Sequence, residues 1–284
     1  NKATLSVKAD DAEKVYGDIN PSFTATFNGF KNGEKVSDGV FTGYPEFNTS
    51  AGTTSDVNTY TVTPVLGTLE STNYAFTYQS GVLTINKALL TLLGDTLAKT
   101  YGAINPSLTY KVSGLKNADT WAGQVQGSAN LNTDATELSP VGPYIVTVED
   151  NNLSSSNYNF AFRNGLLNIG KATITVSAEN KTRIYGDPNP EFTYQYAGFK
   201  NGEDSLTINK TGQPDLTTTA VGTTAVGNVA ITANVAGMSS QNYLFTAVNG
   251  TLTITKAPLT IAGDNKARIY GDPNPALTVT YTGF

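Results

Sequence analysis

Apolar and polar residues alternate along short stretches of this chain. Phe23, Ala25 and Phe27 are apolar at every second position, and threonines fill the positions between them. A period of two predicts a β-strand with one buried face. The same alternation recurs at residues 60–63, 74–77, 83–85, 108–112, 144–147, 192–196 and 277–281. The only helical element that the pattern permits is one turn near residues 201–204, so we expect an almost purely β chain.

One arrangement of residues returns every 84 or 85 positions. Tyr-Gly begins at residues 16, 101, 185 and 270, and each copy is soon followed by Asn-Pro. The segments Asn180–Phe199 and Asn265–Phe284 are identical at 14 of 20 positions. Each complete copy also contains Asn-Tyr and closes on the pattern Gly-x-Leu-x-Ile. The chain therefore consists of three repeats of about 85 residues and the first third of a fourth.

The buried side of the strand changes where one repeat meets the next. Apolar residues occupy odd positions in residues 83–85 and even positions in residues 88–92, and the change falls at Lys87. The same change of parity occurs at Lys171 and Lys256. A shift of one residue moves the buried side chains to the other face of a strand. We therefore expect one strand to leave the core of one repeat and enter the next; a β-bulge within a single sheet is the alternative.

These features predict an all-β chain of tandem small domains. The predicted boundaries are 1–86 (repeat 1), 87–170 (repeat 2), 171–255 (repeat 3) and 256–284, the N-terminal third of repeat 4. Six or seven strands in each repeat favour an immunoglobulin-like sandwich, with a β-grasp arrangement as the alternative. Each repeat is large enough for a small core of its own, so we expect separate beads rather than a continuous solenoid.

Two further expectations concern the way in which the repeats are joined. No Gly/Ser-rich or Pro-rich linker separates them, so the repeats are expected to form an extended rod of roughly 100–130 Å. Two strands alone do not make a stable domain. Residues 256–284 are therefore expected to dock as a hairpin on repeat 3 or to pair with a neighbouring molecule.

Composition restricts the chemistry that the chain can perform. It has no His and no Cys, which excludes Ser-His and Cys-His nucleophiles, thiolate and imidazole zinc sites, and disulfides. The net charge of −5, with scattered Lys and Arg, argues against a nucleic-acid partner. The longest nearly apolar run, residues 88–93, is too short for a membrane span. The 42 Thr, 15 Tyr and 12 Phe are typical of a folded β protein.

The most prominent short motif is Tyr-Gly-Asp-Pro-Asn-Pro, at residues 185–190 and 270–275. Gly permits unusual backbone angles and Pro fits the second position of a turn, so the motif predicts a rigid turn beside a buried Tyr. The alternative is a calcium site formed by Asp18, Asp187 and Asp272 with nearby Asp10, Glu179 and Asp264. Ala103 replaces the turn aspartate in repeat 2. We therefore predict no metal, no cofactor and no catalytic residue, and we keep calcium as the alternative.

Acidic and basic residues also recur at a fixed phase. The pairs are Asp10/Lys14, Asp95/Lys99, Glu179/Arg183 and Asp264/Arg268. Two strand ends that meet across a short turn would bring each pair together, and we interpret the pairs as register markers rather than catalytic groups. Trp121, the only Trp, is expected to pack against the fold; an exposed Trp that stacks on a sugar is the alternative.

The combined motifs resemble those of the MBG repeat family, of the type that carries a Tyr-Gly-x motif. The resemblance rests on residues 185–190, on Gly-Phe-x-Asn-Gly-Glu at residues 198–203, on Asn242-Tyr243 and on residues 250–257. It covers essentially the whole chain. Ala103 and Ala118 depart from the pattern, which argues against a metal site shared by the family.

The resemblance implies a part of a very long, secreted bacterial surface protein, often an adhesin and often from the Bacteroidota, without catalytic residues. We therefore expect a structural spacer in the stalk of such an adhesin, which projects a binding region away from the cell. Its partner would be the remainder of the surface protein, and its location extracellular, at the bacterial cell surface. The alternative is an adhesive module that binds glycans or like copies in cell–cell adhesion. Neither function involves an enzyme activity, nucleic acid or membrane contact by this segment.

Overall fold

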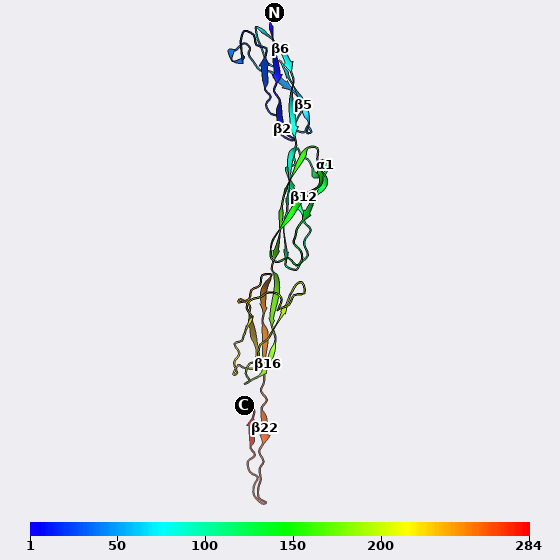
Figure 1. The fold of residues 1–284 in the computed structure, drawn as a ribbon. Helices are drawn as coiled ribbons and strands as arrows, with labels where there is room; N and C mark the ends of the chain where they lie inside the picture. Colours follow the sequence, from blue (N-terminus) through cyan, green and yellow to red (C-terminus); the bar gives the residue numbers. More distant parts are fainter. The chain divides into compact units, whose positions relative to one another are not determined.

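The computed structural model describes residues 1–284 and is almost entirely β (Figure 1). The chain packs as two compact units. Unit 1 contains residues 1–97, 107–134 and 144–167, and unit 2 contains residues 98–106, 135–143 and 168–284. Repeat 2 thus contributes residues to both units. None of the helices is long and apolar enough to cross a membrane.

Repeat 1, in unit 1, is built from two sheets. In the first, β1 (Ala3–Ala9) lies between β3 (Ala25–Asn28) and β6 (Tyr74–Gln79), antiparallel to β3 and parallel to β6. The second has the order β2-β7-β5-β4, formed by β2 (Ala12–Val15), β7 (Gly81–Asn86), β5 (Thr59–Val65) and β4 (Glu46–Asn48). The first stretch of chain therefore supplies β1 to one sheet and β2 to the other.

The two sheets enclose the core that the alternation predicts. Leu5, Val7 and Ala9 are fully buried on β1, and Leu83 and Ile85 are buried on β7. This is a sandwich rather than the single helix-covered sheet of a β-grasp fold. Its parallel pairs, β1 with β6 and β2 with β7, are a feature that the alternation alone does not reveal.

Repeat 2 has the same plan. One sheet contains β8 (Ala88–Gly94) between β10 (Tyr110–Ser113) and β13 (Tyr158–Arg163). The other has the order β11-β12-β14-β9, formed by β11 (Gln126–Asn132), β12 (Gly142–Ser154), β14 (Gly165–Gly170) and β9 (Thr96–Thr100). The helical turns of the chain are the 3₁₀ turn η1 (Val36–Asp38) and α1 (Trp121–Gln124). The helical turn that the sequence permits near residues 201–204 does not form, because that segment makes a tight turn around Asn201, which has a positive φ of 54°.

The strand that joins repeat 1 to repeat 2 behaves as the change of parity predicts. β7 ends at Asn86 in a sheet of repeat 1, and β8 begins at Ala88 in a sheet of repeat 2. Only Lys87 stands between them. The hydrophobic core is continuous across this point, since Tyr16 of repeat 1 and Tyr158 of repeat 2 belong to one buried cluster. Within unit 1, the expectation of separate beads is therefore wrong.

Repeat 3, in unit 2, repeats the sandwich. Its first sheet has β15 (Ala172–Ala178) between β17 (Tyr194–Ala197) and β20 (Tyr243–Val248). Its second sheet has the order β16-β21-β19-β18, formed by β16 (Lys181–Ile184), β21 (Gly250–Thr255), β19 (Gly227–Asn234) and β18 (Asp215–Thr217). Ile231, Leu252 and Ile254 form the centre of its core.

Residues 256–284 form an antiparallel hairpin of β22 (Thr260–Gly263) and β23 (Val279–Thr282) (Figure 1). None of these residues is buried, and the apolar Ile261 and Tyr281 are about half exposed. The predicted docking on repeat 3 is therefore wrong. The hairpin stays exposed because the strands that would bury it are missing. In repeat 3, β15 is flanked by β20 and packs against the second sheet, and residues 256–284 contain no counterpart of β20 or of that sheet.

Candidate functional site at the junctions between repeats

The recurring acidic and basic residues make separate contacts rather than the predicted pairs. In repeat 1, Asp10 accepts hydrogen bonds from the hydroxyls of Thr24 and Thr26, both at 2.7 Å. Lys14 is buried and donates to the carbonyls of Asp18 (3.0 Å) and Gly52 (2.6 Å). Asp10 lies where the chain leaves β1 for β2. Because the chain changes from one sheet to the other here, Asp10 faces β3 whereas Lys14 faces the Tyr-Gly turn. The expected pair of Asp10 with Lys14 therefore does not form.

The other repeats use these positions in the same way. In repeat 3, Glu179 accepts a hydrogen bond from the hydroxyl of Thr193, and Arg183 donates to the carbonyl of Val221. The equivalent acidic residues also accept from a threonine hydroxyl, Asp95 from Thr109 and Asp264 from Thr278. The equivalent basic residues also donate to a carbonyl, Lys99 to that of Thr136 and Arg268 to that of Asp272. Hydrogen bonds from Thr193, then Gln195 and Lys181, lower the pKa of Glu179 to about 2. The hydroxyl bonds likewise lower the pKa of Asp10, Asp95 and Asp264. The acidic residue of each set therefore binds the chain at the start of the third strand, and the basic residue stabilises the Tyr-Gly turn.

The acidic residues proposed for calcium are not gathered into a site. The structure contains no group of three or more acidic side chains that could hold a metal ion. Asp10 is bound by hydroxyls, and Asp18 forms an ion pair with Lys116 instead. The calcium alternative therefore lacks the ligand set that it requires.

The tyrosine of the Tyr-Gly turn of repeat 1 is buried against repeat 2. Tyr16 is only 3% exposed, and its hydroxyl donates to Oδ2 of Asp119 at 3.1 Å. The hydroxyl of Tyr158 donates to the same oxygen at 2.6 Å. The two rings pack edge to face, with centroids 5.4 Å apart. Asp119 thus joins a tyrosine from each repeat in one hydrogen-bonded cluster, in which the rings also gain packing energy.

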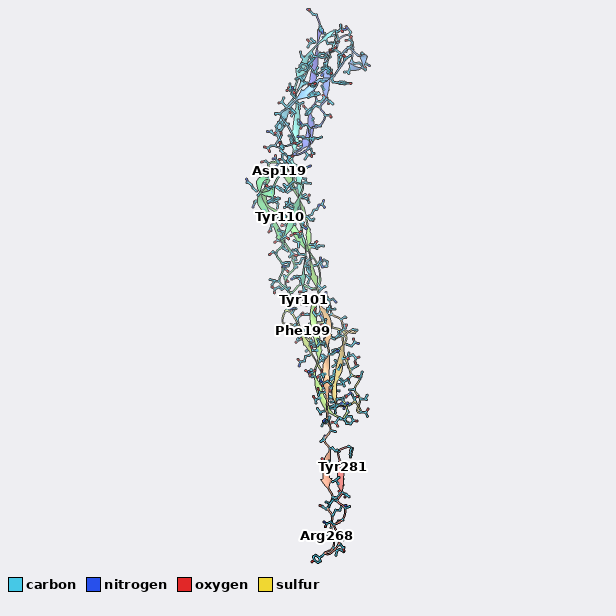
Figure 2. The ribbon with its side chains drawn as sticks, turned by 180° about the vertical axis from the view of Figure 1, so that it is seen from behind. Tyr101, Tyr110, Asp119, Phe199, Arg268 and Tyr281 are labelled. Carbon is cyan, nitrogen blue, oxygen red and sulfur yellow. The ribbon has the colours of Figure 1, made fainter.

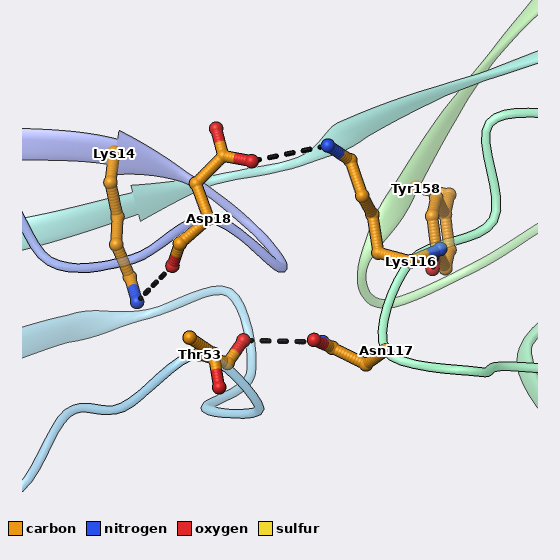
Figure 3. Close-up of polar contacts among 6 residues, drawn as sticks. All are labelled: Lys14, Asp18, Thr53, Lys116, Asn117 and Tyr158. Carbon is orange, nitrogen blue, oxygen red and sulfur yellow. Dashed lines mark hydrogen bonds and ion pairs between the residues drawn. The ribbon is translucent and has the colours of Figure 1, made fainter.

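The backbone beside Tyr16 fits closely against repeat 2. Gly17 has a φ of +84°, and a Cβ added there would lie 2.5 Å from Cβ of Lys116. The Lys116 ammonium pairs with Asp18 at 3.1 Å, and the Asn117 amide donates to the carbonyl of Thr53 at 3.1 Å (Figure 3). Glycine is therefore required at this turn for both its backbone angle and the approach of the next repeat.

The Asn of the recurring Asn-Tyr dipeptide completes the contact. Asn157 Oδ1 accepts from the backbone N–H of Val57 at 3.0 Å, and its Nδ2 donates to Asp56 at 2.8 Å. Asn157 is only 3% exposed. Because an unpaired buried amide is costly, these two bonds fix the position of the loop of repeat 1 against repeat 2 within unit 1.

Unit 2 contains a second junction of the same kind. Tyr101 donates to Oε1 of Glu203 at 3.0 Å, and Tyr243 donates to the other carboxylate oxygen. The two tyrosine rings are 5.5 Å apart and nearly perpendicular. Asn242 Oδ1 accepts from the N–H of Val141 at 3.0 Å. Figure 2 shows Tyr101 near Phe199, whose ring also packs on Tyr243. Aspartate and glutamate thus perform the same task at the two junctions.

The junction explains motifs that the sequence presents separately. The prediction of a turn is confirmed by the positive φ of its four glycines, Gly17, Gly102, Gly186 and Gly271. The predicted burial of its tyrosine is wrong for Tyr185 and Tyr270, which are exposed, because no receiving carboxylate of a further repeat covers them; Tyr16 and Tyr101 are buried. The partner of its Tyr was missed, because it lies about 100 residues away along the chain. The available signal is a carboxylate 18 residues after each of Tyr16, Tyr101 and Tyr185, at Glu34, Asp119 and Glu203. Trp121 packs between Tyr110 and Phe160, which confirms its predicted packing role.

Residues 5–84, 90–168 and 174–253 each match the MBG domain (YGX type). The chain belongs to the MBG domain family. The Tyr-Gly turn that characterises this type of MBG repeat is, in this chain, the contact that binds one repeat to the next. No curated protein matches the sequence.

Several solved structures of tandem β domains show a weak likeness to these MBG repeats. The I9–I11 tandem of titin is 11% identical, with a TM-score of 0.25, and the match covers 89% of this chain and 100% of that one. The protocadherin GammaB4 extracellular domain is 11% identical, with a TM-score of 0.23 and coverage of 96% and 52%. Drosophila N-cadherin EC1-3 is 10% identical, with a TM-score of 0.20 and coverage of 71% and 78%.

The junction tyrosines predict a loss of stability at high pH. Burial, followed by the hydrogen bond to Asp119, raises the pKa of Tyr158 to about 12. A pKa above the ordinary value of about 10 means that folding favours the protonated phenol. This contribution is complete below pH 10 and is lost as the pH rises toward 12. We expect the melting temperature of unit 1 to fall across this interval.

The variant Tyr158→Phe provides the control, because it retains the ring and removes the ionisable hydroxyl. Its melting temperature at pH 8 should be lower than that of the parent chain, and its further fall between pH 10 and 12 should be smaller. Calorimetry across this range measures both quantities. An equal alkaline fall in the two chains would mean that Tyr158 is not the responsible group.

Proposed function

We propose that this chain is a structural spacer, a stalk segment of a large bacterial surface adhesin that projects a binding region away from the cell. In this proposal it is secreted, extracellular and displayed at the bacterial cell surface. Its partner is the remainder of the surface protein, and it performs no enzymatic reaction. Its membership in the MBG family and its tandem repeats support this assignment.

The observation that carries the proposal is the reuse of one junction. Tyr16 with Asp119 and Tyr101 with Glu203 form equivalent contacts in two different places. A spacer has to limit bending between its domains, and a buried hydrogen-bonded contact does so where a Gly/Ser linker would not. At the first junction, only Lys87 separates the two strands.

A glycan-binding module would need exposed aromatic rings that recur in each repeat. The recurring Tyr74, Tyr158 and Tyr243 are instead buried, each at most 2% exposed, and the tyrosine of the Tyr-Gly motif is buried at Tyr16 and Tyr101 although it is exposed at Tyr185. They support the core and the junctions. The spacer function is therefore the better supported of the two.

Small-angle X-ray scattering of the full chain in dilute solution tests the proposal. We expect an extended particle with a maximum dimension of about 100–130 Å, estimated from strands of 7–9 residues at about 3.3 Å per residue. A variant with a flexible Gly-Ser insert between Asn86 and Lys87 is the control and should give a broader distribution of distances. A compact particle, or identical distributions for the two chains, would contradict a spacer.

A further inference from the structure

Beside the Tyr-Gly turn of repeat 1, a basic side chain and an amide hold a short loop by its backbone. Lys14 donates to the carbonyl of Gly52 at 2.6 Å, and Asn20, the Asn of the Asn-Pro dipeptide, donates to the carbonyl of Ala51 at 2.8 Å. The next carbonyl, that of Thr53, accepts from repeat 2 (Figure 3). The same loop is therefore held both from within repeat 1 and by repeat 2.

Repeats 2 and 3 hold the corresponding loops in the same way. The basic residue and the amide again donate to two successive carbonyls: Lys99 to Thr136 and Asn105 to Ala135 in repeat 2, and Arg183 to Val221 and Asn189 to Ala220 in repeat 3. The basic residue is lysine in repeats 1 and 2 but arginine in repeat 3. The three repeats therefore compare two cations in one structural setting.

The two cations differ in what they do for the oxygen of the amide. In repeat 3, Nε of Arg183 donates to Oδ1 of Asn189 at 2.8 Å. The equivalent Oδ1 atoms of Asn20 and Asn105 are buried and have no hydrogen-bond partner within the protein. Turning these amides over would not help, because their nitrogens already donate to the loop carbonyls. Since a buried acceptor without a partner is costly, both lysine-containing repeats need a donor that the protein itself does not supply.

Lysine leaves an N–H group unused at this place. The Lys14 ammonium donates to the carbonyls of Asp18 and Gly52, and because it has three N–H groups, one remains. Lys99 donates to the two equivalent carbonyls of repeat 2. Arginine is larger and carries more donors, so lysine in its place leaves room as well as a donor. In repeat 2, a pocket of about 520 Å³ lies against Asn105. A polar site with room and two or more partners is what a bound water requires.

We infer that repeats 1 and 2 each bind a water molecule between the lysine ammonium and the asparagine amide oxygen, and that Arg183 excludes this water from repeat 3. The water accepts from the remaining N–H of the lysine and donates to Oδ1 of Asn20 or Asn105. Lysine and water together thus make the contacts that the guanidinium makes alone. Because Lys14 holds both the Tyr-Gly turn and the loop that contacts repeat 2, the water supports the first junction. The inference does not rest on the spacer function.

A high-resolution crystal structure of the full chain, with its ordered waters, tests the inference directly. We expect a water within hydrogen-bonding distance of both the ammonium and the amide oxygen in repeats 1 and 2. The reciprocal variants should exchange the sites: Lys14→Arg should lose the water of repeat 1, and Arg183→Lys should gain one on Asn189. A parent chain in which Asn20 or Asn105 has no such water overturns the inference. So does an Arg183→Lys chain in which Asn189 gains none.

The melting temperature of unit 1, measured by calorimetry, provides a second readout. Lys14→Arg replaces a water-mediated contact by a direct one and releases the water, so we expect a rise of about 1–4 °C. The control Lys8→Arg changes an exposed lysine of the same repeat and should have no effect. In an Asn20→Ala chain, which lacks the amide oxygen, Lys14→Arg should bring no rise. A Lys14→Arg chain that melts no higher than the Lys8→Arg chain overturns the inference, as does a rise that persists without Asn20.

Discussion

Replacing Tyr16 with alanine is expected to destabilise unit 1 by about 3–5 kcal/mol, the usual cost of truncating a buried aromatic residue. The substitution removes a ring that is 3% exposed and packed against Tyr158, together with the hydrogen bond to Asp119. Tyr101→Ala should have a comparable effect on unit 2. Thermal and denaturant unfolding, followed by calorimetry and fluorescence, measure the two effects.

Tyr185→Ala is the matched control, because it alters the same motif where no following repeat covers it. Tyr185 is 44% exposed, so its loss should cost less than about 1 kcal/mol. Equal losses for Tyr16→Ala and Tyr185→Ala would show that the tyrosine stabilises its own turn rather than the junction.

Gly17→Val is expected to cost about 2–6 kcal/mol, the sum of backbone strain and overpacking. A branched side chain is strained at a φ of +84°, and its Cβ would lie 2.5 Å from Cβ of Lys116. The added Cβ would clash with Cβ of Lys116, and this atom cannot move away unless the Lys116 backbone moves as well. The midpoint of denaturant unfolding measures the loss.

Gly186→Val separates the two contributions. Gly186 has a φ of +91° but no atom within 4 Å of an added Cβ. Only the strain remains, and we expect a loss of about 1–3 kcal/mol in repeat 3. If both valine variants lose the same amount, the approach of Lys116 contributes nothing and the junction is looser than the structure indicates.

The sequence predicts the strands and their faces because burial alternates with a period of two. Leu83, Ile85, Leu90 and Leu92 are buried as their parity requires, and the strand changes sheets at Lys87. These are local properties, which a few neighbouring residues determine.

The contacts at the junctions could not be predicted in the same way. The partner of Tyr16 is Asp119, and nothing near either residue indicates which surface of the next repeat faces the turn. The pair Asp10/Lys14 was predicted wrongly because the change of sheet between β1 and β2 separates residues that are close in sequence. The predicted docking of residues 256–284 on repeat 3 is wrong because the first strands of a repeat are buried only by strands that come later in the same repeat.

The parallel pairing of the last strand of a repeat has a mechanical consequence. β2 runs beside β7 in the same direction, with Ala12 opposite Leu83 and Val15 opposite Asn86. When the two ends of repeat 1 are pulled apart, tension enters through its first strand, β1, which is parallel to β6, and leaves through its last strand, β7, which is parallel to β2. The hydrogen bonds between two such parallel strands are then sheared together instead of being unzipped one after another. Repeat 3 has the same clamp, in which Lys181 to Ile184 pair with Leu252 to Thr255. The rupture of these strands sets the unfolding rate under tension, so the geometry favours slow extension under load.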